Sequence, residues 1–132
     1  MKTIDDVLAE LAKSKFRRRF RLAGADRAYL GAKGLAHVLD HARGFIETRL
    51  APAEPRNDGR QTPFRGHPVF VAQHATASCC RSCIAKWHAI PRGRPMTAAE
   101  MTYVLDLLQH WLRTQCPDPA PLPAKTQGEL QL

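Results

Sequence analysis

Apolar residues recur at intervals of three and four over residues 4–15, 34–50 and 98–114. This spacing lines one face of an α-helix, so each stretch is predicted to be a helix that buries its apolar face. The last stretch also begins with a capping box, in which Thr97 and Glu100 can satisfy each other's backbone N–H groups. We therefore expect a mainly α-helical domain.

The segments between these helices carry weaker patterns. Asp26 can cap a short helix that runs through Leu30. Residues 51–66 contain three prolines and an Asn57-Asp58-Gly59 turn, and they are predicted to form a loop. Residues 68–73 include valine and phenylalanine, which favour strands, so we expect a short extended or β segment there.

One further helix is predicted from about Cys79 to Ala89. Ser78 is a favourable N-cap residue, and Pro91 and Gly93 follow the expected end, where they stop a helix. The clustered cysteines of the chain are therefore expected at the start of a helix.

The composition changes near residue 116. From Pro117 onward prolines alternate with other residues, a pattern that forms neither helix nor sheet. We expect residues 1–115 to form a single globular domain and residues 116–132 to form a disordered tail. The chain has no apolar run of about 18 residues, so no segment is expected to span a membrane. Its first residues lack the apolar core of a signal peptide, which favours the reducing cytoplasm.

Three of the four cysteines lie within five residues, and a histidine flanks them on each side. Thiolate and neutral imidazole are the ligands that zinc prefers, so the cluster predicts a zinc site. The first-choice ligands are His74, Cys80, Cys83 and His88, with Cys79 as the alternate. His41 or His67 can supply the fourth position from a distance, and His41 shares a helix face with His37.

Two enzymatic interpretations remain open beside a zinc-binding domain. A thiol-based redox enzyme can use the Cys79–Cys83 cluster, because a helix N-terminus and Arg81 both lower the pKa of a thiol. A metal-dependent nuclease can use His67 or His74 to activate water. Carboxylate-based hydrolysis is disfavoured, since no acidic residue lies between residues 59 and 99.

The chain is strongly basic, with a formal net charge of +8 at pH 7. Such a charge attracts polyanions, and nucleic acid is the partner that we expect. The residues expected to face it are Lys15, Arg17, Arg18, Arg19, Arg81 and Lys86. Phe16 and Phe20, which bracket the arginines, are expected to dock on the core. A basic surface that serves only solubility is the alternative.

Several short motifs are spread along the chain: Ser14-Lys15-Phe16-Arg17, His41-Ala42, Phe45-Ile46, Arg49-Leu50-Ala51-Pro52, Asn57 to Pro63, His67-Pro68-Val69-Phe70 and Gln73 to His88. Together they resemble the domain of unknown function 4186 of bacteria and phages, over about residues 12–113. The resemblance implies a small intracellular bacterial domain to which no activity is assigned. It also singles out further site residues: His41, Asn57, Asp58, Gly59, Gln61 and His67.

Overall fold

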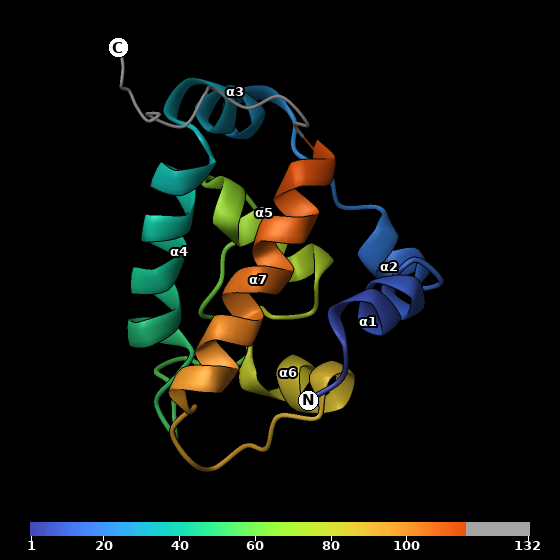
Figure 1. Cartoon of the computed structure of the whole chain (residues 1–132). Coiled ribbons are helices and arrows are strands. Elements are labelled where there is room, and N and C mark those ends of the chain that lie inside the picture. The colour runs from blue at the N-terminus through green and yellow to red at the C-terminus, as the bar shows by residue number, and fades with distance from the viewer. Residues whose placement is uncertain (116–132) are drawn as a thin grey trace.

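The sequence folds into helices wherever apolar residues recur at helical spacing, as a computed structural model describing residues 1–115 shows (Figure 1). Seven helices and no strand form within that range: α1 (Ile4–Leu11), α2 (Lys15–Arg18), α3 (Gly24–Lys33), α4 (Leu35–Arg49), α5 (Pro68–Ala75), α6 (Arg81–His88) and α7 (Ala98–Gln115). The prediction of a small, mainly α-helical single domain is confirmed. The tail predicted over residues 116–132 lies outside the described residues.

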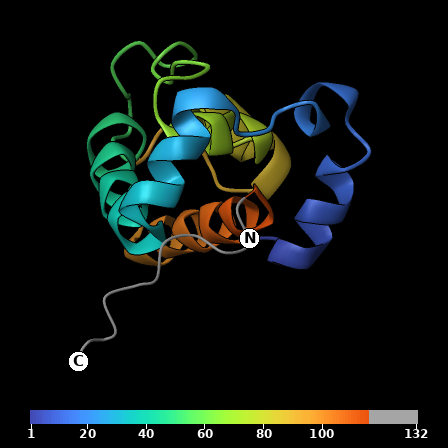
Figure 2. The ribbon, with the colours of Figure 1, turned by 90° about the horizontal axis from the view of Figure 1, so that it is seen from above.

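The core lies between α4 and α7, which run side by side (Figure 1). Apolar residues of α4 such as Val38 and Ile46 belong to the same buried cluster as Val104 and Leu108 of α7. Helix α5 packs against both, while α1 and α2 lie together at one side of the molecule (Figure 2). None of the helices in residues 1–115 combines the length and the apolar character needed to cross a bilayer.

The prediction of an extended segment at residues 68–73 is wrong, because these residues belong to helix α5. Pro68 occupies the first turn, where its missing N–H costs nothing, and the ring of His67 caps the helix by accepting from the Val69 N–H at 3.1 Å. All residues of α5 except Phe70 are buried. A helix buried all round has no polar face, so its sequence does not show helical periodicity.

Helix α6 begins at Arg81, two residues later than the sequence indicates. Cys80 is its N-cap, and its sulfur accepts from the Cys83 N–H at 3.4 Å. The hydroxyl of Ser78, the expected cap, lies 2.9 Å from that of Thr76 instead. Cys79 and Cys80 therefore precede the helix, where the backbone can turn their sulfurs toward Cys83.

The capping box predicted at the start of α7 is confirmed. The Glu100 N–H donates to Thr97 Oγ1 at 3.1 Å, and the Thr97 N–H donates to Glu100 Oε1 at 2.9 Å. Arg94 adds a bidentate pair with the Glu100 carboxylate at 2.7 and 2.8 Å. These contacts fix the loop between α6 and α7 to the first turn of α7.

Arg81 is buried, with only 1% of its surface exposed. Its Nη1 donates to the carbonyls of Leu50, Ala51 and Pro52, and its Nη2 donates to those of Pro91 and Arg94, at 2.7–3.3 Å. The expectation that Arg81 faces nucleic acid is thus wrong, because its guanidinium is sealed among backbone carbonyls. It joins the chain after α4 to the chain after α6.

We predict that Arg81→Lys destabilises the protein strongly. A lysine ammonium is too compact to reach carbonyls on both sides, and each buried acceptor left unpaired costs about 1–3 kcal/mol. The free energy of unfolding, measured by urea denaturation, should fall by about 3 kcal/mol or more. Arg92→Lys is the matched control, since Arg92 is exposed and, within residues 1–115, its side chain reaches only Ser82 and Asp58. Equal urea midpoints for the two variants would contradict the anchoring role of Arg81.

Candidate metal centre

The sulfur atoms of Cys79, Cys80 and Cys83 gather at the start of α6 and form a three-cysteine cluster. All three lie within 4.8 Å of one another, and those of Cys79 and Cys83 are 3.7 Å apart. Sulfurs that share one tetrahedral zinc ion lie about 3.8 Å apart, because each Zn–S bond is about 2.3 Å long. The cluster can therefore hold a metal ion with small adjustments of its side chains.

A tight turn between α5 and α6 brings these sulfurs together. Ala77 adopts a left-handed conformation, with φ at 58°, and the Ser78 N–H donates to the Gln73 carbonyl at 2.8 Å. The hydroxyl of Thr62, from the loop after α4, donates to the Cys79 carbonyl at 2.8 Å. The backbone of the cluster is thus held from both sides before any ligand binds.

Arg17 of α2 reaches the cluster from a distant part of the chain. Its Nη2 donates to Cys83 Sγ at 3.1 Å, and its Nη1 donates to the His74 carbonyl at 2.7 Å and approaches Cys79 Sγ at 3.8 Å. Only 9% of Arg17 is exposed, so its assignment to a nucleic-acid surface is wrong. A guanidinium in this position stabilises negative charge on the sulfurs.

The pKa values of all three thiols are raised. The thiol of Cys80 is the main cause for Cys79, and that of Cys79 is the main cause for Cys83, with burial adding to both. For Cys80 the interaction with Cys79 lowers the pKa, but the interaction with Cys83 and burial together outweigh it. The metal-free cluster thus holds protons at neutral pH, which a metal ion would have to displace.

The two flanking histidines do not join the cluster. His88 is fully buried, and its ring nitrogens contact the Thr76 carbonyl at 2.8 Å and the Tyr103 hydroxyl at 2.9 Å. The Nε2 of His74 contacts the Thr62 carbonyl at 2.9 Å. Burial lowers the pKa of both rings, so both are neutral and serve as hydrogen-bonding groups of the interior.

His41 and His67 meet in a second cluster, where α3, α4 and α5 converge. The Nδ1 of His41 lies 2.9 Å from the Nε2 of His67, and the Tyr29 hydroxyl lies 2.9 Å from the Nε2 of His37. The rings of His37 and His41 are 4.5 Å apart, as expected for residues on one helix face. Nothing in the sequence indicated Tyr29, which comes from a different helix.

Asn57, Asp58 and Gln61 position the helix that carries Cys83. Asp58 Oδ1 accepts from the Arg81 N–H at 3.1 Å, at the first residue of α6, and from Gln61 Nε2 at 3.0 Å. The turn requires left-handed backbone at Asn57, with φ at 57°, and at Gly59, with φ at 99°. The Asp58 carboxylate, held by Gln61, therefore braces the loop against the first residue of α6, while Asn57 and Gly59 shape the turn.

The fold and this site define a small all-helical domain that carries three adjacent thiols beside a buried arginine. The chain belongs to the family described as Domain of unknown function (DUF4186), whose model matches residues 5–113. The resemblance inferred from the sequence motifs is thus confirmed. No solved structure matches the chain. Because the family description assigns no activity, the function has to be argued from the site itself.

We predict that His67 titrates near pH 4 in the folded protein. Burial is the main cause and the adjacent His41 the next, and together they lower the pKa of His67 from 6.5 to about 4. As the pH falls, the unfolded chain therefore binds this proton before the folded protein does. The contribution of neutral His67 to the free energy of unfolding is complete above pH 6.5 and is lost as the pH falls toward 4.

Two-dimensional NMR of the imidazole resonances measures this titration directly, and His67→Asn assigns the signal. Asparagine preserves a side-chain acceptor for the Val69 N–H, so the cap of α5 survives. The free energy of unfolding of this variant, measured by urea denaturation, should also depend less on pH between pH 7 and 4 than that of the wild type. A His67 midpoint at the ordinary value of 6.5 would be incompatible with this environment.

Proposed function

We propose that this domain binds a zinc ion through the thiolates of Cys79, Cys80 and Cys83. The observation that carries the proposal is the convergence of the three sulfurs within 4.8 Å. Zinc binds thiolates strongly and favours four ligands, so three protein ligands leave one position for water or another molecule. His74 and His88 are not needed as ligands, since both already have partners in the protein.

Arg17 supports the choice of a charged thiolate site. Three thiolates and one Zn²⁺ ion carry a net charge of −1, which is costly in a buried place unless a cation balances it. The Arg17 guanidinium, 3.1 Å from Cys83 Sγ, supplies that charge. The N-terminus of α6 adds backbone N–H groups, one of which already donates to Cys80 Sγ.

The redox alternative is less well supported. A thiol-based catalyst needs a thiolate at neutral pH, and this requires a lowered pKa. Here the pKa of each of the three thiols is raised, despite Arg17. The nuclease alternative is also less well supported, because no carboxylate or imidazole of residues 1–115 joins the three-cysteine cluster.

A basic surface beside the metal centre forms the second part of the proposal, and nucleic acid is its partner. Lys15, Arg18 and Arg19 are exposed around α2, and Lys86 is exposed on α6. Phe16, expected in the core, is 42% exposed, and the Arg19 guanidinium lies 5.0 Å from its ring centre. Exposed aromatic and basic side chains together suit a single strand.

We predict that protein purified without added zinc contains one zinc ion per chain and that Cys83→Ser loses it. A serine hydroxyl is a poor zinc ligand, so the affinity should fall by about 100-fold or more. Elemental analysis gives the stoichiometry, and competition with a chelator gives the affinity. Thiol titration should show three sulfurs that react only after chelation.

Ser82→Ala is the matched control, because Ser82 lies inside the same segment but is exposed and not among the three cysteines. It should retain zinc. Wild-type protein with no stoichiometric metal, and with freely reactive thiols, would refute the zinc site. One rapidly alkylated cysteine among Cys79, Cys80 and Cys83 would favour the thiol enzyme instead.

We predict that replacing Lys15, Arg18 and Arg19 together by glutamine weakens binding to a single-stranded oligonucleotide. For each phosphate that the variant no longer neutralises, the slope of log affinity against log salt should become shallower by about 0.7. Fluorescence anisotropy at several salt concentrations measures that slope. The control replaces Arg43, Arg56 and Arg60, which are also exposed and carry the same charge. An equal weakening in both triple variants would show that binding is not localised around α2.

A further inference from the structure

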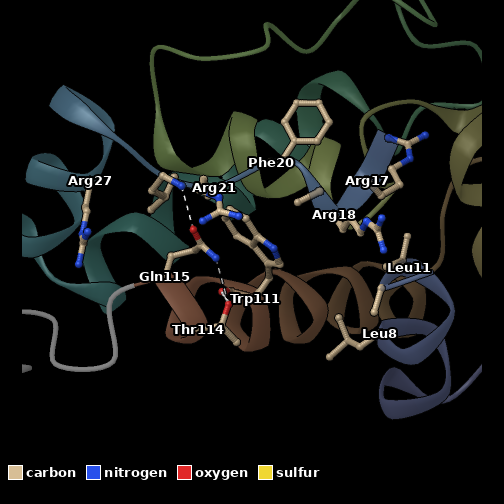
Figure 3. Close-up of a pocket in the computed structure, with 13 residues that line it drawn as sticks. Leu8, Leu11, Arg17, Arg18, Phe20, Arg21, Arg27, Trp111, Thr114 and Gln115 are labelled. Atoms are coloured by element: carbon tan, nitrogen blue, oxygen red, sulfur yellow. Dashed lines mark hydrogen bonds between the residues drawn. The ribbon is translucent and has the colours of Figure 1, made fainter. Parts of the chain in front are cut away.

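A cavity of about 480 Å³ opens between helices α1 and α2, the segment before α3, and the C-terminal end of α7 (Figure 3). Its volume falls within the range of small-molecule sites, about 300–1,000 Å³. Gln115 shapes one end, because its Oε1 accepts from the Leu22 N–H at 2.8 Å and so ties the segment before α3 to α7. The cavity is distinct from the three-cysteine cluster, none of whose residues lines it.

Four arginines line this cavity: Arg17, Arg18, Arg21 and Arg27. No carboxylate of residues 1–115 belongs to the lining. The ion pairs found within the same part of the chain involve none of them, and Glu10 of the neighbouring α1 pairs with Lys2. Guanidinium groups bind phosphate oxygens in pairs of parallel hydrogen bonds. Figure 3 shows Arg21 near the middle of the cavity, Arg27 toward one end, and Arg17 and Arg18 toward the other. The arginines therefore suit a molecule with more than one phosphate group.

Trp111 of α7 forms part of the same lining and points into the cavity (Figure 3). It is half-buried, so its ring is held by the core while part of its surface remains accessible. Indole rings stack on nucleobases, and such stacking is worth about 1–3 kcal/mol per base. An aromatic face beside Arg21 matches a molecule that carries both a base and a phosphate (Figure 3).

From this juxtaposition we propose that the cavity binds a nucleotide. Trp111 takes the base, and Arg21, which lies beside it, takes the phosphate of that nucleotide (Figure 3). Arg18 and Arg27, toward the two ends of the cavity, are placed for further phosphates. The inference rests on the proposed basic surface and deepens it, since it assigns one nucleotide unit to a defined pocket. That unit is either a free nucleotide or a nucleotide of a single strand, and both present the same base and phosphate.

The test uses the full chain, with its zinc content measured for every variant. Trp87→Phe leaves Trp111 as the one tryptophan. In that background, AMP and ATP should change the fluorescence of Trp111 in a saturable way. Oligonucleotides of about ten residues, with and without a 5′-phosphate, distinguish a strand from a free nucleotide. A strand that binds where AMP and ATP do not would identify the strand as the source of the nucleotide.

Substitutions then separate the two halves of the site, with affinities measured by calorimetry. Arg21→Gln should weaken the binding of AMP by about tenfold, equivalent to about 1.4 kcal/mol, and Arg27→Gln should weaken the binding of the oligonucleotides by about as much. Arg43→Gln and Arg60→Gln, exposed arginines outside the cavity, should have no effect. Trp111→Leu should weaken the binding of AMP but not of inorganic phosphate, whereas Trp111→Phe, which keeps an aromatic ring, should restore it.

Each of the following results would overturn the inference. AMP, ATP and both oligonucleotides fail to bind, or inorganic phosphate binds as tightly as AMP, or the cavity and control arginines prove equivalent. Oligonucleotide binding that depends on Lys15 and Arg19 but not on Arg21, Arg27 or Trp111 would refute the pocket and leave the proposed basic surface intact. Arg17 is not substituted. Because its side chain contacts Cys83, a substitution there would confound the zinc measurement.

Discussion

The guanidinium of Arg81, sealed inside the protein, joins the chain segments that frame the candidate metal centre. It donates to carbonyls that follow α4 and to carbonyls that follow α6, while the backbone N–H of Arg81 donates to Asp58. Separating these segments would leave a buried charge and several carbonyls without partners, which costs several kcal/mol. Because Arg81 is the first residue of α6, the position of Cys80 and Cys83 depends on the same anchor.

The three-cysteine cluster is held in an electrostatic balance that a metal ion would resolve. Mutual proximity and burial oppose ionisation of the thiols, whereas Arg17 and the start of α6 favour it. The first effects dominate in the metal-free protein, so the thiols keep their protons. A divalent cation bound there would reverse the balance, since the attraction of three thiolates to a common centre would outweigh their mutual repulsion.

Much of the fold was predictable from local patterns, because α1, α4 and α7 each bury one face and leave a clear period in the sequence. Helix α5 was missed because it is buried all round, and a run with Val69, Phe70 and Val71 then resembles a strand. The three cysteines were found because they are neighbours in sequence. Arg17, 66 residues from Cys83, could not be found, since no local pattern records a contact made by tertiary packing.

The block from Lys15 to Arg19 shows how one basic run can serve two purposes. Successive residues of a helix point about 100° apart, so a short helix such as α2 turns one arginine inward and its neighbours outward. Arg17 reaches the sulfurs, while Lys15, Arg18 and Arg19 are exposed. A polyanion held by those outer side chains would therefore act on the helix that carries the guanidinium balancing the cluster. If such binding moved α2, it would change the distance from Arg17 to Cys83, and with it the stability of negative charge on the sulfurs.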